Sequence, residues 1–171
     1  MPARTSPGCG KPGGPKRPGA RALRHAVVRV LPYTPRQLFE LVGDVRSYPE
    51  FVPWITSMRV WNERADAQGE SRLDAEAAVG FSFLRERFST RVKRDPAAGE
   101  ITVSLISGPF RRLFNRWKFH EDPAGTRVEF EIDFEFKSRL LQTLLAANFH
   151  HAVDRLIGCF EDRARALYAK P

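Results

Sequence analysis

The segment Val128–Phe136, VEFEIDFEF, alternates apolar and acidic side chains without interruption. Because successive side chains of a strand point to opposite faces of a sheet, this alternation predicts a strand with one buried face and one wet face. Antiparallel sheets commonly have this arrangement, since one of their faces can remain in water. The segment therefore predicts an antiparallel sheet whose buried face carries Phe130, Phe134 and Phe136.

The same period of two extends upstream from this strand for about eighty residues. Polar turns separate the alternating runs, and the turns ending at Gly69 and at Gly99 are the clearest. Short turns favour an antiparallel meander, because parallel neighbours need a crossover of about a dozen residues. The strands expected here are 55–66, 70–81, 83–94, one through Ile101–Leu105 and one through Leu113–Phe119, preceded by a first strand over 25–31.

Helical signals flank this meander on both sides. Thr34-Pro35 offers an N-cap and a proline at the first helical position, which predicts a helix over 35–43. The segment 44–54 contains two prolines and predicts a second short, compact turn. After Ser138 the apolar spacing becomes helical for about thirty residues. The expected class is α+β, with about seven curved antiparallel strands wrapped on one long C-terminal helix and two short helices after the first strand.

Length and composition agree with a single globular domain preceded by a tail. The chain has 171 residues and is 42% hydrophobic, which is enough apolar side chain to build one core. No apolar run approaches the ~20 residues of a membrane-spanning helix. The formal charge of +8 favours an anionic partner such as nucleic acid or a lipid surface. We therefore expect a basic tail over 1–22 and a ligand-binding domain over 23–171.

The predicted tail contains five basic residues, no acidic residue and ten prolines or glycines, a composition that predicts disorder. The domain that follows keeps a formal charge of only +3. One interpretation is a solvated tail, or an assigned start that lies upstream of the true start, with the fold beginning near Leu23. The other interpretation is a basic arm that binds anionic lipid or RNA. It matches neither a signal peptide nor a mitochondrial presequence.

Motifs for metal or nucleophile chemistry are missing from the sequence. Cys9 lies in the tail and Cys159 in a predicted helix, so we expect no disulfide and a reducing compartment. The four histidines have no metal-ligand spacing with cysteines or carboxylates. We also find no glycine-rich phosphate loop and no serine elbow, so no catalytic residue is assigned.

The predicted inner face combines large and small side chains. Trp117 and Phe130 lie on it together with Ala75 and Ala77. Large residues packing against small ones explain this pattern as an ordinary core. A cavity between the helix and the sheet, of the kind in which apolar ligands bind, explains it equally well.

Two stretches of the chain resemble the coenzyme Q-binding START-domain family of the polyketide cyclase/dehydrase-like superfamily. The first comprises Leu31–Pro35, Phe39–Val42 and Asp44–Trp54, and the second is Gly108–Phe119. The resemblance covers about 24–168. It implies a helix-grip fold around an apolar tunnel that binds ubiquinone as a ligand, with no required cofactor and no catalysis. It also implies a cytoplasmic protein that associates peripherally with the inner membrane.

Sequence pattern and resemblance together select the side chains expected to line the ligand cavity. They come from the corner after the first helix, the inner faces of the strands and the C-terminal helix. The expected cavity residues are Phe51, Trp54, Ala75, Ala77, Val79, Phe81, Phe88, Leu105, Phe110, Trp117, Phe130, Phe134, Phe136, Leu141, Leu144, Leu145 and Phe149. Glu86 and Asn115 have the same strand parity as their apolar neighbours, so we expect both to point inward; an edge position or an arginine partner also explains Glu86.

The segment Phe110, Arg111, Arg112, Leu113 and Phe114 combines apolar and basic side chains after Gly108-Pro109. We interpret it as a loop that contacts an anionic bilayer, with its apolar residues among acyl chains and its arginines at lipid phosphates. The alternative interpretation is a hairpin end whose aromatic residues cover the core.

Three functions remain open from the sequence. The first is a non-enzymatic carrier of a prenylated quinone. The second is a regulator that binds the large ribosomal subunit, because ribosome association toxins resemble the chain too and because basic side chains follow one another on the predicted strands over 83–94 and 111–118. The third is a polyketide cyclase or aromatase. The oligomeric state and the ligand's chain length stay undetermined.

Overall fold

The computed structural model describes residues 22–81 and 84–169, apart from the side chain of Phe81. The prediction of a disordered tail falls on residues that, except for Ala22, lie outside this part of the chain.

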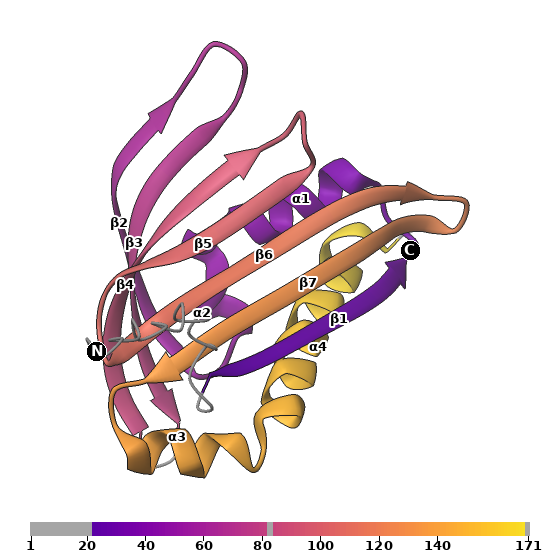
Figure 1. The fold of residues 1–171 in the computed structure, drawn as a ribbon. Helices are drawn as coiled ribbons and strands as arrows, with labels where there is room; N and C mark the ends of the chain where they lie inside the picture. The colour runs from indigo at the N-terminus through magenta and orange to yellow at the C-terminus, as the bar shows by residue number, and fades with distance from the viewer. Residues whose placement is uncertain (1–21, 82–83, 170–171) are drawn as a thin grey trace, which may run out of the picture.

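One antiparallel sheet organises the molecule (Figure 1). Its seven strands lie in the order β1-β7-β6-β5-β4-β3-β2. The first strand pairs with the last one, and β2 to β7 form a meander in which each strand pairs with the next. Every neighbouring pair is antiparallel, as the short turns predicted. The strands are β1 (Leu23–Leu31), β2 (Ile55–Ala65), β3 (Ser71–Phe81), β4 (Leu84–Asp95), β5 (Glu100–Ser107), β6 (Phe110–Asp122) and β7 (Gly125–Phe136).

The connection from β1 to β2 contains α1 (Pro35–Gly43), the single turn η1 (Val45–Ser47) and α2 (Tyr48–Phe51). Thr34 and Gln37 form a capping box, in which each side chain accepts a hydrogen bond from the other residue's backbone N–H. Together with Pro35 at the first helical position, this box starts α1 where the sequence predicted it.

The C-terminal helical segment is interrupted, so the prediction of one helix of about thirty residues is wrong. It consists of α3 (Arg139–Ala146), capped by Ser138, and α4 (Phe149–Tyr168). Asn148 lies between them with φ −124° and ψ 17°, outside helical geometry, and its N–H bonds to the carbonyl of Leu145 at 3.1 Å. Asparagine favours caps over helix interiors, and the break changes the direction of the chain before α4 begins.

The buried stripe of α4 packs on the concave face of the sheet (Figure 1). Phe149 meets Phe134 with ring centroids 4.9 Å apart, and Phe160 meets Trp117 at 5.0 Å. These contacts fix α4 over β6 and β7, while the β2–β3 hairpin projects away from it. The structure confirms the predicted α+β helix-grip fold.

Within the described residues, none of the helices is long and apolar enough to cross a membrane.

Candidate functional site

Residues that face each other across an antiparallel pair share one face of the sheet. Val103 on β5 is opposite Asn115 on β6, and Asn115 is opposite Ile132 on β7. Ile132 has the same parity as the buried Phe130 and Phe134, which contact Trp117 and α4. This row of side chains therefore lies on the concave face.

Helices cover the concave face unevenly. Under α4 the side chains of Trp117, Phe130 and Phe134 are buried. Across β2 to β5, in contrast, several inward-facing apolar residues pack against the core and yet remain partly exposed, although Leu73, Val92 and Ile101 on the same face are buried. The partly exposed residues are Met58, Val60, Phe88, Val103 and Leu105. The concave face thus has a closed half under α4 and an incompletely covered apolar half over β2 to β5, which we call the open half.

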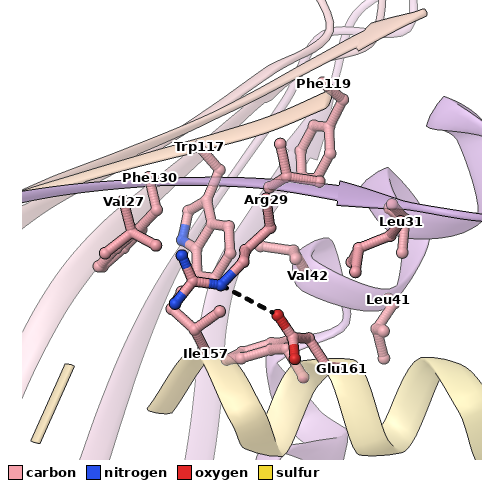
Figure 2. A pocket seen from close by; sticks show the side chains of 13 residues that line it. Val27, Arg29, Leu31, Leu41, Val42, Trp117, Phe119, Phe130, Ile157 and Glu161 are labelled. Carbon is pink, nitrogen blue, oxygen red and sulfur yellow. Dashed lines mark ion pairs between the residues drawn. The ribbon is translucent and has the colours of Figure 1, made fainter. Parts of the chain in front are cut away.

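The closed half contains a small apolar cavity between β1, β6, β7, α1 and α4 (Figure 2). Its volume is about 20 Å³, whereas pockets for small-molecule ligands measure ~300–1,000 Å³. Trp117 contacts both Phe130 and Phe160, and all three side chains line the cavity. Arg29 of β1 and Glu161 of α4 form an ion pair of 3.4 Å at its edge. The apolar tunnel implied by the resemblance is therefore not open at this place.

An aromatic cluster lies at the end of the concave face near α3. The ring centroid of Phe110 is 5.2 Å from that of Phe88, 6.1 Å from that of Phe134 and 4.7 Å from that of Phe136. Gln142 of α3 is buried beside it, and its side-chain oxygen accepts a hydrogen bond of 2.9 Å from the backbone N–H of Phe136. The cluster therefore joins α3 to β6 and β7.

The expected membrane loop over 110–114 is corrected by the structure. Phe110 begins β6 and packs in the aromatic cluster with part of its surface exposed, and Leu113 is buried, so these two side chains pack inward from a strand instead of extending from a loop. A shift in register between Phe110 and Arg112 marks a bulge, which changes the parity of the residues that follow. Phe114 is exposed, and Arg112 pairs with Asp133 at 3.1 Å. Arg111 remains exposed.

The other expected cavity residues occupy several environments. Ala75 and Ala77 are buried on β3, and Phe149 is buried on α4. Phe51 lies at the end of α2, where its ring contacts that of Phe160 of α4 at 5.1 Å. The side chains that are only partly buried are Trp54, Val79, Leu141 and Leu145. The expected position of Phe81 concerns a side chain outside the described part.

Leu144 does not lie in the interior, because 44% of it is exposed. Leu140, four residues before it on the same face of α3, is 69% exposed. The exposed basic residues Lys137 and Arg139 are beside them in the sequence. The sequence does not reveal this exposed pair of leucines. Leu141 and Leu145 continue the apolar stripe of the helix, so Leu144 beside them was predicted to face inward as well.

Polar groups are few among the inward positions near the open half. Asn115 points inward as expected, and its Oδ1 atom is buried without a hydrogen-bond partner. Thr90, opposite Leu105, is buried, and Glu86, opposite Val79, is partly buried. A single amide, hydroxyl and carboxylate can orient a polar head group.

A second cavity, of about 390 Å³, lies at the opposite end of the molecule and is polar. Arg94 pairs with Glu40 at 2.9 Å, and Arg46 pairs with Glu63 at 2.8 Å, so its charges neutralise one another. The cavity is lined by Glu40, Leu41, Gly43, Asp44, Arg46, Ser47, Glu63, Leu73, Arg94, Arg163, Leu167 and Tyr168. The sequence contains no local sign of this cavity, because its lining residues come from α1, η1, three strands and the end of α4. In the described ranges no three His, Cys, Asp or Glu side chains cluster to hold a metal ion.

Cross-strand ion pairs occupy most of the basic stripes that suggested phosphate contacts. Arg87 lies 3.4 Å from Glu76, and Arg116 lies 2.6 Å from Glu131. Further pairs on the same strands are Lys93–Glu70, Lys118–Glu100 and Arg112–Asp133. Most basic side chains of these strands therefore already face a carboxylate on a neighbouring strand.

Asp74 is the buried member of this outer network. Arg91 donates to it from Nε at 2.8 Å, and the Asn62 amide donates to it at 3.0 Å. The hydrogen bond from Arg91, followed by that from Asn62, holds the pKa of the Asp74 carboxyl below its ordinary value.

Comparison with known proteins agrees with the fold. Residues 31–161 match the profile of the family described as polyketide cyclase/dehydrase and lipid transport. The solved structure of an 18 kDa protein, CC1736, from Caulobacter crescentus is 60% identical, covers 86% of this chain and 99% of its own, and superposes with a TM-score of 0.73.

Two named relatives point to different functions. The ribosome association toxin RatA of Rickettsia prowazekii is 34% identical over 140 residues, which are 80% of this chain and 92% of that protein. The mitochondrial coenzyme Q-binding protein COQ10 homolog B of Xenopus laevis is 28% identical over 156 residues, which are 89% of this chain and 62% of that protein.

Proposed function

Because the chain belongs to the polyketide cyclase/dehydrase and lipid transport family and has its helix-grip fold, we propose that it binds a prenylated quinone such as ubiquinone. The ligand lies on the concave face and is carried or presented to the respiratory chain without chemical conversion. The 28% identity to a coenzyme Q-binding protein supports this choice of ligand class.

The observation that carries the proposal is the open half of the concave face. Met58, Val60, Phe88, Val103 and Leu105 pack against the core but keep part of their apolar surface in water. Covering apolar surface contributes ~25 cal/mol per Å², and a prenyl chain has several hundred Å² to bury. The isoprenoid chain therefore supplies most of the affinity, and the ring supplies orientation.

The closed half limits how the ligand enters. A cavity of about 20 Å³ between β1, β7 and α4 has no room for a quinone ring, so the ligand approaches over β2 to β5. The break at Asn148 separates α3 from α4, so α3 can move without unfolding α4. Displacement of α3 would widen access beside the aromatic cluster around Phe110.

Peripheral contact with an anionic bilayer belongs to the same proposal and is assigned to α3. Leu140 and Leu144 expose apolar surface on one face of this helix, and Lys137 and Arg139 lie near them. Leucines that enter the acyl region beside cations that meet lipid phosphates are typical of interfacial helices. The helix contacts β7, and Phe136 of β7 joins it through Phe110 to Phe88 at the border of the open half, so α3 would bring the ligand site to the membrane.

Ribosome association is the second candidate function. The 34% identity to a ribosome association toxin over most of both chains favours it. The ion pairs of the outer strands oppose it, because Arg87, Arg116 and Lys118 already face acidic partners. Phosphate binding by these side chains would have to displace carboxylates.

Lipid extraction and sedimentation distinguish the two candidates. The protein purified from its natural host should contain a prenylated quinone that organic extraction and mass spectrometry identify. Lysate separated on a sucrose gradient should leave the protein in the light fractions. Empty protein that also fails to bind added ubiquinone would refute the proposal, and co-migration with large ribosomal subunits would favour the second candidate.

A further inference from the structure

Asn115 lies in the middle of the concave face among apolar side chains. Leu113 and Trp117, its neighbours of the same parity on β6, are buried. Val103 and Ile132 face it from the two adjoining strands. A carboxamide in such surroundings adds nothing to apolar packing that a leucine could not supply.

The hydrogen bonds of this amide are incomplete. Its Oδ1 atom is buried and has no hydrogen-bond partner within the part of the chain that the structure describes. Buried polar groups are nearly always paired, since an unpaired one has lost its contacts with water without compensation. The unpaired amide therefore indicates a group that a ligand or an ordered water would complete.

The position of Asn115 relative to α4 follows from the ring contacts on both sides of it. Trp117 contacts Phe160 at one end, and Phe134 contacts Phe149 at the other. The row of Asn115 and Ile132 lies between these two contacts, and Val103 continues it onto β5 at the border of the open half. Ile132 and Val103 are only partly buried, so the amide adjoins surface that α4 does not fully cover.

We propose that the Asn115 amide donates a hydrogen bond from Nδ2 to a carbonyl oxygen of the bound head group and thereby selects ligands that carry one. This inference rests on the proposed function. A benzoquinone ring has only acceptor oxygens, so the amide N–H is the complementary group. A 180° turn of the amide exchanges its donor and acceptor ends, so the present position of Oδ1 is compatible with this role.

The test compares two ligands and three proteins. Decylubiquinone has carbonyl groups, whereas phenyldecane has a ring and a chain of the same length but no acceptor. Binding of each is measured by titration against the wild-type chain, Asn115→Leu and Asn115→Asp. Asn115→Leu removes the amide at similar volume, and Asn115→Asp keeps the shape but replaces the donor by a carboxylate.

We expect both variants to bind decylubiquinone about tenfold more weakly and phenyldecane as well as the wild type does. Asn115→Leu should also raise the melting temperature, because it removes an unpaired buried polar group. Equal affinity of Asn115→Leu and wild type for decylubiquinone would overturn this inference alone. A wild-type protein that binds neither ligand would overturn the proposed function and the inference with it.

Discussion

The guanidinium of Arg94 lies directly against the Cα atom of Gly43, so close that a Cβ atom at this position would collide with Nε. Arg94 comes from β4 and Gly43 ends α1, and the same guanidinium stacks over the ring of Phe39 at 5.4 Å and pairs with Glu40. The absence of a side chain at position 43 therefore gives Arg94 of β4 the space to contact Phe39 and Glu40, and these contacts connect α1 to the sheet.

This relationship predicts opposite effects for two glycine substitutions in helices. Gly43→Ala should lower the free energy of unfolding by about 1 to 2 kcal/mol, because Arg94 must leave its position. Gly158→Ala in α4 should raise it by up to about 1 kcal/mol, since the added methyl group meets no atom within 4 Å beyond its chain neighbours and the backbone of its own helix, and alanine favours the helix. Chemical denaturation measures both, and equal stabilisation by the two would show that Arg94 moves aside without cost.

The exposed leucines of α3 predict how the protein meets a membrane. Leu140→Ser combined with Leu144→Ser should reduce binding to phosphatidylglycerol vesicles at least tenfold, because about 1.5 to 3 kcal/mol accompanies full burial of each leucine. The melting temperature should stay nearly unchanged, since both side chains are exposed.

Leu167→Ser is the matched control for this double variant. Leu167 is 50% exposed but lies at the other end of α4. It should bind vesicles like the wild type in a co-sedimentation assay. Equal binding by all three proteins would exclude α3 from membrane contact.

The strands could be predicted from the sequence because each has one buried and one wet face. The alternation of Val128–Phe136 exists for that reason, and β2 and β3 were predicted within one residue of their observed ends. The start of α1 was equally accessible, since the capping signal of Thr34 is local.

The features that were missed depend on tertiary packing. Leu145 and Phe149 continue one apolar stripe across the break, so the periodicity contains no sign of Asn148 as an interruption. The bulge after Phe110 depends on the pairing of β6 with β7, and it turned an expected membrane residue into a core residue. The volume left beside Trp117 depends on side-chain conformations, which a pattern of apolar residues does not determine.

The bulge also separates two neighbouring arginines that looked equivalent in the sequence. Arg112→Glu should lower the free energy of unfolding by about 1 kcal/mol, because it places a carboxylate beside Asp133 and opposite Glu135. Arg111→Glu should leave stability within about 0.5 kcal/mol of the wild type, since Arg111 is exposed. Thermal unfolding of the two single variants measures the difference, and an equal loss in both would contradict the placement of Arg112 against Asp133.

Asp74 predicts a pH dependence of stability. Its pKa in the folded protein is lowered by Arg91 and Asn62, so the carboxylate stabilises the fold above its unfolded pKa of about 3.9. That contribution is lost as the pH falls from there through the folded pKa. Asp74→Asn should therefore be less stable than the wild type by a constant amount between about pH 5 and pH 7, and the difference should shrink below about pH 4. Urea unfolding of both proteins across this range measures it. A difference that stays constant down to the lowest pH would mean that the substitution acts through hydrogen-bond geometry and not through the charge of Asp74.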